Sequence, residues 1–141
     1  MRTCVPVLSL VLLPLLAASC GTPMSTTFNT TSPQPVAPTL RCVLFVTDSL
    51  GYKARLVNGS QGVEATHNDS ALASYEDGRF EKISATGKNS KSNDGSSSLV
   101  VTAMTISQHW TRIGLESDEV PASDRVKQDA KTLVARCGGG S

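Results

Sequence analysis

The chain has little of what a catalytic or metal-binding protein usually needs. Only two of its 141 residues are histidines, His67 and His109. Neither stands in a spacing such as H-x-x-x-H or beside a C-x-x-C motif. A nucleophile elbow, a phosphate-binding loop and a dinucleotide-binding fingerprint are also missing from the sequence. We therefore predict no catalytic residues, no metal site and no cofactor, and expect a protein that is not an enzyme.

Aromatic residues and an excess of one charge are also scarce. Aromatic residues make up 4% of the chain, and 13 Lys and Arg against 12 Asp and Glu leave a net charge of +1. A chain so evenly balanced has no electrostatic reason to bind nucleic acid. The length is enough for one domain, whose core must be small and aliphatic.

Residues 1–19 have the three parts of a secretory signal peptide. Arg2 and the amino terminus give a positive start, residues 5–16 form an apolar stretch, and residues 17–19 are small. The apolar stretch is too short, and too interrupted by proline, to form a membrane-spanning helix. No later segment approaches 18 consecutive apolar residues, so the mature chain is not expected to cross a membrane.

A cysteine follows the small residues directly, in the pentapeptide Leu16-Ala17-Ala18-Ser19-Cys20. This stretch resembles the lipobox of bacterial lipoproteins, although that class prefers leucine where Ala17 stands. The resemblance implies that Cys20 receives a diacylglycerol, that cleavage occurs just before it, and that the new amino terminus is acylated. Two or three acyl chains would hold the protein at a membrane, whereas one chain binds only marginally. Gly21, where an aspartate often retains such proteins at the inner membrane, implies the outer membrane, facing the periplasm.

A secreted, glycosylated eukaryotic protein is the alternative origin. Asn29, Asn58 and Asn68 each stand in the N-x-S/T pattern that accepts N-linked glycans. Some such matches arise by chance in a chain that is rich in Ser and Thr.

Residues 20–39 are expected to form a lipidated, disordered tether. Residues 21–39 carry no charge and no periodic apolar pattern, and Thr, Ser and Pro dominate them. Such a segment cannot bury enough surface to offset its ordering entropy. As a flexible coil it would span on the order of 25 Å, and would hold a domain of residues 40–138 away from the lipid. Residues 139–141 would be a short tail.

The first part of the domain predicts strands. Residues 40–47 are almost continuously apolar and β-branched, which indicates a buried strand. The Asn-Gly pair at 58–59, between alternating residues, predicts a hairpin with a type I′ turn. That turn would place Lys53 opposite Glu64, with apolar residues on the other face.

The middle of the chain leaves one element open. Residues 70–76 could form a short helix capped by Asp69, or a strand of a second hairpin closed by residues 77–78, which we favour. Residues 79–86 would then be the returning strand, and residues 87–98 a polar loop.

The longest strand candidate spans residues 99–110, and residues 114–122 are expected to be a connector with several acidic side chains. The apolar residues of this strand alternate with polar ones, which predicts the side that faces the core. These residues are Val100, Met104, Ile106 and Trp110.

The last element is expected to be an amphipathic helix. Ser123 suits its N-cap, Asp124 its first turn and Gly138 its end. Its apolar stripe consists of Val126, Ala130, Leu133, Val134 and Cys137. The sequence therefore predicts an α+β fold, an antiparallel β-meander of about five to six strands with one C-terminal amphipathic helix packed on one face.

Two cysteines remain in the predicted domain. Cys42 would share a strand face with Leu44 and Val46, and Cys137 lies on the helix stripe. If the helix packs on that face the two can meet, and export to an oxidising compartment favours a disulfide. Two buried free thiols are the alternative.

These features predict a membrane-anchored envelope lipoprotein without a specified role. Its expected partners are the membrane, through Cys20, and an envelope protein or polymer, bound by a non-catalytic binding, adaptor or assembly module. An exposed apolar patch would favour that function. A closed apolar pocket would favour a small-ligand or enzyme-inhibitor module. A cleft that gathers His67 or His109 with a carboxylate would favour a hydrolase.

Overall fold

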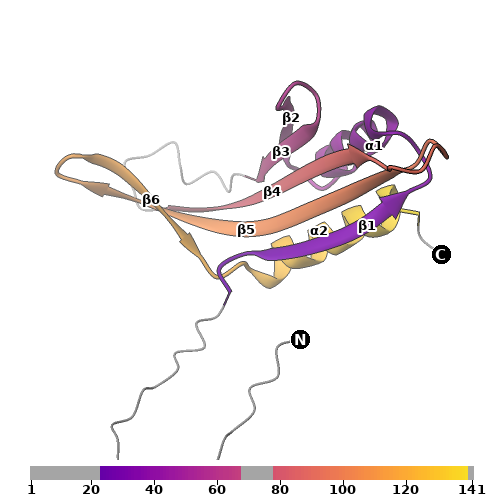
Figure 1. Ribbon diagram of the computed structural model, residues 1–141. Helices are drawn as coiled ribbons and strands as arrows, with labels where there is room; N and C mark the ends of the chain where they lie inside the picture. The colour runs from indigo at the N-terminus through magenta and orange to yellow at the C-terminus, as the bar shows by residue number, and fades with distance from the viewer. Residues whose placement is uncertain (1–22, 68–77, 140–141) are drawn as a thin grey trace, which may run out of the picture.

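The computed structural model describes residues 23–67 and 78–139. Within these ranges the chain forms six strands and two helices (Figure 1). In chain order they are β1 (Thr26–Ser32), α1 (Val36–Ser49), β2 (Lys53–Val57), β3 (Gly62–His67), β4 (Gly78–Asn89), β5 (Ser97–Thr111), β6 (Gly114–Val120) and α2 (Asp124–Cys137).

The six strands form one antiparallel sheet. Strands β2 to β6 are a meander, in which each strand pairs with the next along the chain. Strand β5 is long enough to take two partners along its other edge, β1 beside residues 97–103 and β6 beside residues 105–111. The α+β class, the antiparallel sheet and the C-terminal helix are thus confirmed, and α1 is an additional helix.

Both helices pack on the same face of the sheet, α2 against β1 and β5 and α1 against β2, β3 and β4 (Figure 1). The side chains on this face are buried at every second position, as the alternation of a strand requires. Apart from Tyr52, the core consists of aliphatic and small residues, as expected. Its members are Leu40, Val43, Val46, Tyr52, Val63, Ala65, Ile83, Ala85, Leu99, Val101, Ala103, Ala122, Val126, Ala130, Leu133 and Cys137.

The prediction of a buried strand at residues 40–47 is wrong, because these residues lie in α1. Leu40, Val43 and Val46 are spaced as one face of a helix and are buried against the sheet. The run looked continuous because Phe45 is also apolar, yet its side chain is 74% exposed. Packing of the apolar face outweighs the modest helix propensity of the β-branched residues.

The predicted disordered tether is wrong for residues 26–39. Residues 26–32 pair with β5 along their whole length, and residues 36–39 begin α1. Two of the side chains that suggested disorder, Ser32 and Thr39, instead form a buried network with Ser97. The Thr39 hydroxyl lies 2.9 Å from that of Ser32 and 3.2 Å from that of Ser97. The domain therefore begins at least 14 residues earlier than expected, at β1.

The predicted β2–β3 hairpin is present with a longer turn. Asn58, Gly59 and Ser60 all have positive φ, and the register places Arg55, not Lys53, opposite Glu64. Because the shift is two residues, each side chain keeps the face that was predicted. The returning strand at residues 79–86 is confirmed within β4. Residues 70–76 lie outside the described residues.

Two expectations for the last strands are wrong. The buried face of β5 carries Leu99, Val101 and Ala103, while Val100 and Trp110 are exposed. Residues 114–120, expected in a connector, form β6 because they pair with the end of β5. The polar loop is shorter than residues 87–98, since β4 extends to Asn89 and β5 starts at Ser97.

The C-terminal helix is confirmed in its bounds and its buried face. The Ser123 hydroxyl accepts a hydrogen bond from the Val126 backbone N–H, which is the predicted N-cap. Four of the five stripe residues are buried, and the fifth, Val134, packs against the core.

Candidate functional site: the open face of the sheet

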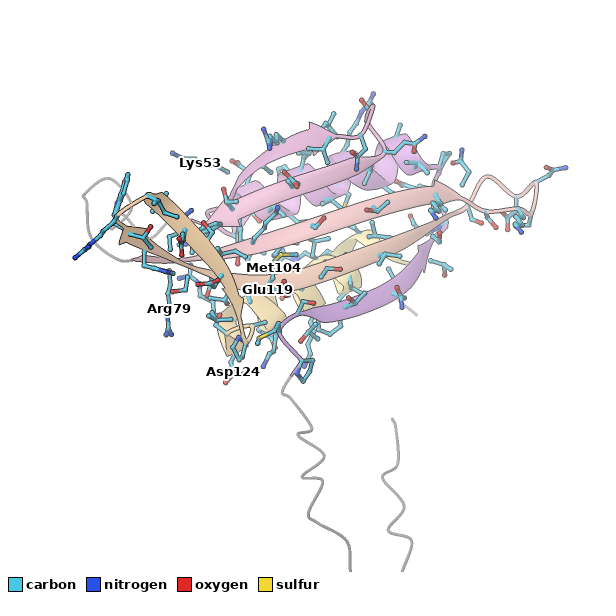
Figure 2. All side chains as sticks on the ribbon, turned by 60° about the vertical axis from the view of Figure 1, so that its left-hand side comes forward. Lys53, Arg79, Met104, Glu119 and Asp124 are labelled. Carbon is cyan, nitrogen blue, oxygen red and sulfur yellow. A yellow bond between two sulfur atoms is a disulfide. The ribbon has the colours of Figure 1, made fainter. Side chains whose placement is uncertain are left out.

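The face of the sheet opposite the helices carries a groove. Figure 2 shows this face with the helices behind the strands, and with Met104 and Lys53 labelled on it. The groove has a volume of about 530 Å³ and is formed by side chains from five strands. Its lining residues are Lys53, Ala54, Arg55, Glu64, Thr66, Phe80, Lys82, Met104, Ile106 and Ser117.

The apolar part of the groove comes from β4 and β5. Phe80 lies directly opposite Ile106 in the sheet register, and Lys82 lies opposite Met104. Such directly paired side chains are in contact on one face of an antiparallel sheet. Phe80, Met104 and Ile106 thus give the groove an apolar surface that the helices do not cover.

The charged part of the groove comes from β2, β3 and β4. Glu64 accepts from the Arg55 guanidinium at 3.1 Å and lies 3.1 Å from Lys82 Nζ. The ammonium of Lys82, and then the guanidinium of Arg55, lower the pKa of the Glu64 carboxyl. Lys53 forms no ion pair with any residue in the described ranges. The groove therefore has three cationic side chains, Lys53, Arg55 and Lys82, and one carboxylate, Glu64. The carboxylate offsets only part of the positive charge.

A mixed apolar and cationic surface can bind an extended, amphipathic and acidic partner. The apolar face of such a partner would pack on Phe80 and Met104, while its acidic groups would form ion pairs with Lys53. The lining combines apolar, cationic and carboxylate side chains, an arrangement that can bind such a partner.

A second cluster of polar side chains lies where α2 meets the sheet. The Tyr52 hydroxyl donates to Asp129 Oδ2 at 2.8 Å, and burial, followed by this hydrogen bond, raises the pKa of Tyr52. Arg125 lies 2.7 Å from His67 Nε2 and 3.6 Å from Glu81. Because arginine can only donate, Nε2 of His67 is the acceptor in this contact. The cluster joins β2, β3, β4 and α2.

This cluster includes a cleft of about 250 Å³ that brings His67 together with Glu81 and Ser123. The Ser123 hydroxyl donates to Glu81 Oε1 at 2.5 Å and accepts from the backbone of α2. Its hydrogen-bonding groups are therefore used in capping the helix, and its partner is a carboxylate rather than a histidine. The cleft meets the composition that would favour a hydrolase, but its geometry is that of a helix cap.

The second histidine lies on the β5–β6 hairpin. His109 is 3.5 Å from Glu116 and 3.6 Å from Asp118, and all three side chains are partly exposed. In residues 23–67 and 78–139 no group of three or more His, Cys, Asp or Glu side chains is arranged to hold a metal ion. His109 thus belongs to a surface charge cluster.

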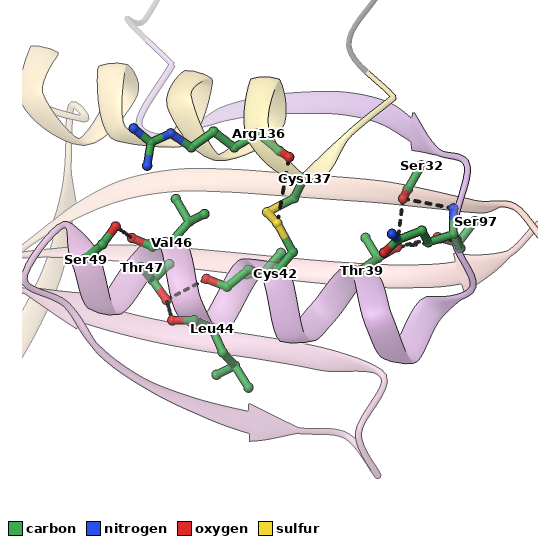
Figure 3. The surroundings of a disulfide bond; sticks show 12 residues. Ser32, Thr39, Cys42, Leu44, Val46, Thr47, Ser49, Ser97, Arg136 and Cys137 are labelled. Carbon is green, nitrogen blue, oxygen red and sulfur yellow. Dashed lines mark hydrogen bonds between the residues drawn. A yellow bond between two sulfur atoms is a disulfide. The ribbon is translucent and has the colours of Figure 1, made fainter.

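The cysteines of the domain form the predicted bond. Cys42 and Cys137 are joined with an S–S distance of 2.08 Å and Cα atoms 5.7 Å apart (Figure 3). The bond links α1 to α2, so Cys42 reaches it from a helix and not from the strand that was expected. Cys20, the expected lipidation site, lies outside the described residues.

Asn29 and Asn58, two of the three possible glycosylation sites, are exposed, and Asn68 lies outside the described residues. Exposure alone is compatible with either expected origin of the chain. Neither described helix is long and apolar enough to cross a bilayer.

The sequence did not identify the groove, although its residues alternate along their strands. Lys53 and Arg55, Glu64 and Thr66, and Met104 and Ile106 are each two positions apart. This period places each pair on one face of a strand. Which face is open depends on where the helices pack, and that is a tertiary property.

Comparisons with known proteins add no family. No family model matches the chain, and no curated protein is similar to it. Among solved structures, a crystal structure of Ara h 8.0201 is similar over 80% of this chain and 91% of that chain, with 17% identity and a TM-score of 0.31. A likeness this slight carries no conclusion about this protein.

Proposed function

We propose that this protein is a lipid-anchored protein of the bacterial cell envelope that binds its partner on the open face of the sheet, without catalysing a reaction. The observation that carries the proposed binding is the groove, in which an apolar surface and three cationic side chains remain uncovered by the helices. The partner class that fits is an extended segment of an envelope protein or polymer that carries acidic groups.

Two features support the proposed location. The leader ends in a sequence that resembles a lipobox, with Cys20 at the position that would be lipidated. The bond between Cys42 and Cys137 is of the kind that persists in exported proteins. A lipid anchor at the start of a small disulfide-linked domain suits a binding or assembly module in the periplasm.

The anchor is tested by replacing Cys20 with serine. The wild-type protein should incorporate labelled palmitate and sediment with membranes, and Cys20→Ser should do neither. A wild-type protein that takes up no fatty acid and is released as a soluble protein would contradict the lipobox. If its mass showed N-linked glycans instead, the eukaryotic origin would replace it.

The groove is tested by site-specific photo-crosslinking in intact cells. A photoreactive residue at Met104, in the groove, should capture a partner, whereas one at Lys131, on the exposed side of α2, should not. Lys53→Glu should reduce the capture at Met104, and the matched change Lys131→Glu should leave it unchanged. Equal capture at both positions, or capture at Met104 that Lys53→Glu does not reduce, would contradict binding in the groove.

The volume of the groove favours a second candidate function, binding of a small amphipathic anion. About 530 Å³ is within the range of ordinary small-molecule sites. Native mass spectrometry of the purified protein should then show a bound molecule that Lys53→Glu releases. If the purified protein shows no bound molecule and the photoreactive residue at Met104 captures a macromolecule, binding of an envelope protein or polymer would be favoured instead.

A further inference from the structure

The tip of the β5–β6 hairpin is apolar and exposed. Trp110 and Leu115 lie directly opposite each other in the register and are 49% and 48% exposed, and Ile113 in the turn between them is 90% exposed. In Figure 1 this hairpin projects at one end of the sheet, beyond the helices. Three large apolar side chains at one protruding end differ from the single exposed apolar residues that are normal on a surface.

The tip has a defined shape. The Thr111 hydroxyl donates to the Gly114 carbonyl at 3.0 Å and accepts from the Ile113 backbone N–H at 3.3 Å. These two bonds close the turn and leave the Ile113 side chain directed to solvent. A preformed apolar tip loses little conformational entropy when it binds.

The other end of the hairpin lies close to the point where the amino-terminal segment enters the domain. The Ala122 backbone N–H, two residues after β6, donates to the Met24 carbonyl at 3.0 Å. Met24 lies four positions after Cys20, so the Cα atoms of the two residues are at most about 14 Å apart when the segment is fully extended. An acyl chain on Cys20 would therefore keep this end of the hairpin near the bilayer surface.

Strand β6 spans the distance between the two ends. Its residues 114–120 rise about 20 Å along the strand. A hairpin held near the lipid at its base can thus bring its tip to the same surface when it lies along the membrane. Tryptophan prefers the interface between headgroups and hydrocarbon, and isoleucine and leucine gain from leaving water.

We propose that the tip formed by Trp110, Ile113 and Leu115 inserts into the lipid interface as a second membrane contact beside the anchor. This contact rests on the lipidation of Cys20 in the proposed function and fixes how the domain is oriented on the membrane. Arg112 in the turn is cationic, but Glu116, Asp118 and Glu119 on β6 are acidic, so the hairpin carries a net negative charge. The contact therefore depends on apolar burial and not on attraction to anionic lipid.

The chain contains a single tryptophan, which makes Trp110 an intrinsic probe of the tip. The full-length protein is purified from membranes and reconstituted into phosphatidylcholine vesicles, with and without bromine on the acyl chains. Brominated lipid should quench Trp110, and its emission should shift to shorter wavelength than in detergent-free buffer. The quenching should persist in high salt.

Ile113→Asp should abolish most of the quenching while the protein stays anchored. The control is Phe45→Asp, because Phe45 is also strongly exposed but lies on α1, away from the hairpin. This variant should be quenched like the wild type. A variant with both changes should behave like Ile113→Asp.

The anchor is measured separately on the same samples, from the mass of the amino-terminal peptide. Acyl chains on Cys20 with no quenching of Trp110 would overturn the membrane contact and leave the anchor in place. No acyl chains and no quenching would overturn both. A blue shift of the Trp110 emission that increases with protein concentration, without quenching by brominated lipid, would show that a second copy of the chain covers the tip. That result would also overturn the membrane contact.

Discussion

The two faces of strand β5 are made of similar residues in different surroundings. Leu99, Val101 and Ala103 point to the helices and are completely buried, while Val100, between them, is 38% exposed. Further along, Met104 and Ile106 line the groove on the open face. The comparison shows that apolar content does not by itself identify the core of this protein. What identifies it is a second layer, and the helices supply that layer on one face.

The two faces also differ in how they are held. On the covered face a covalent bond joins the two helices, and aliphatic side chains fill the space between them and the sheet. On the open face the described contacts include ion pairs at the surface, such as the one between Glu64 and Lys82, and side-chain hydrogen bonds, such as the one from Gln108 to Ser117. We therefore expect changes on the covered face to affect folding, and changes on the open face to affect binding.

The largest effect should come from releasing the helices from each other. Cys42→Ser or Cys137→Ser removes a bond between two residues that lie 95 positions apart in the sequence. The chain-entropy model gives a loss of about 4–5 kcal/mol in the free energy of unfolding, a large part of what a small domain has. Denaturant unfolding of the exported protein measures it, with reduced wild type as the control. If both wild-type thiols alkylate in denaturant without reductant, the bond is absent.

The second effect compares the same substitution on the two faces. Val101→Ala removes a completely buried side chain and should cost about 2 kcal/mol. Val100→Ala, one residue away on the open face, should cost less than about 1 kcal/mol, mainly through strand propensity. Chemical unfolding of both variants under identical conditions measures the difference. Equal losses would mean that the open face is covered in solution.

A smaller effect concerns the polar cluster at the edge of the covered face. Tyr52→Phe removes the hydrogen bond to Asp129 and should cost about 1 kcal/mol at neutral pH. Since burial raises the pKa of Tyr52, the folded state keeps its proton while the unfolded chain loses it near pH ~10. The wild type should therefore lose its advantage over the variant as the pH rises above that value. An unfolding free energy difference that stays constant to high pH would contradict the buried hydrogen bond.

The smallest effect is expected on the open face. Glu64→Gln should cost less than about 1 kcal/mol, because the ion pairs to Lys82 and Arg55 are near the surface and screened by solvent. The lowered pKa of Glu64 means that this contribution is complete above its unfolded pKa of about 4.3, and is lost as the pH falls through the folded value. Added salt should reduce it further. A salt-independent loss would indicate that Glu64 is buried by something on this face.

Helices α2 and α1 differ in how far local sequence features predict them. Helix α2 is predicted by a capping serine, a polar face and an apolar stripe, and all three depend only on neighbours along the chain. Helix α1 has no side-chain cap and no acidic residue in its first turn, and its exposed face includes Phe45. Because the apolar Phe45 interrupts its exposed face, the 3.6-residue period of α1 was hidden, and the β-branched residues favoured a strand.

The sequence by itself determined the α+β class, the hairpin at Asn58 and the C-terminal helix. These features rest on local turn and cap chemistry and on a single apolar stripe. Only the tertiary structure decided that residues 26–32 add a strand, that residues 40–47 are helical and which face of β5 is buried. On that face Ala65, Ala85 and Ala103 are completely or almost completely covered. Their small side chains let two helices approach the sheet closely. A reading by apolar volume favours Met104 and Ile106 instead, and these remain on the open face because no described helix packs there.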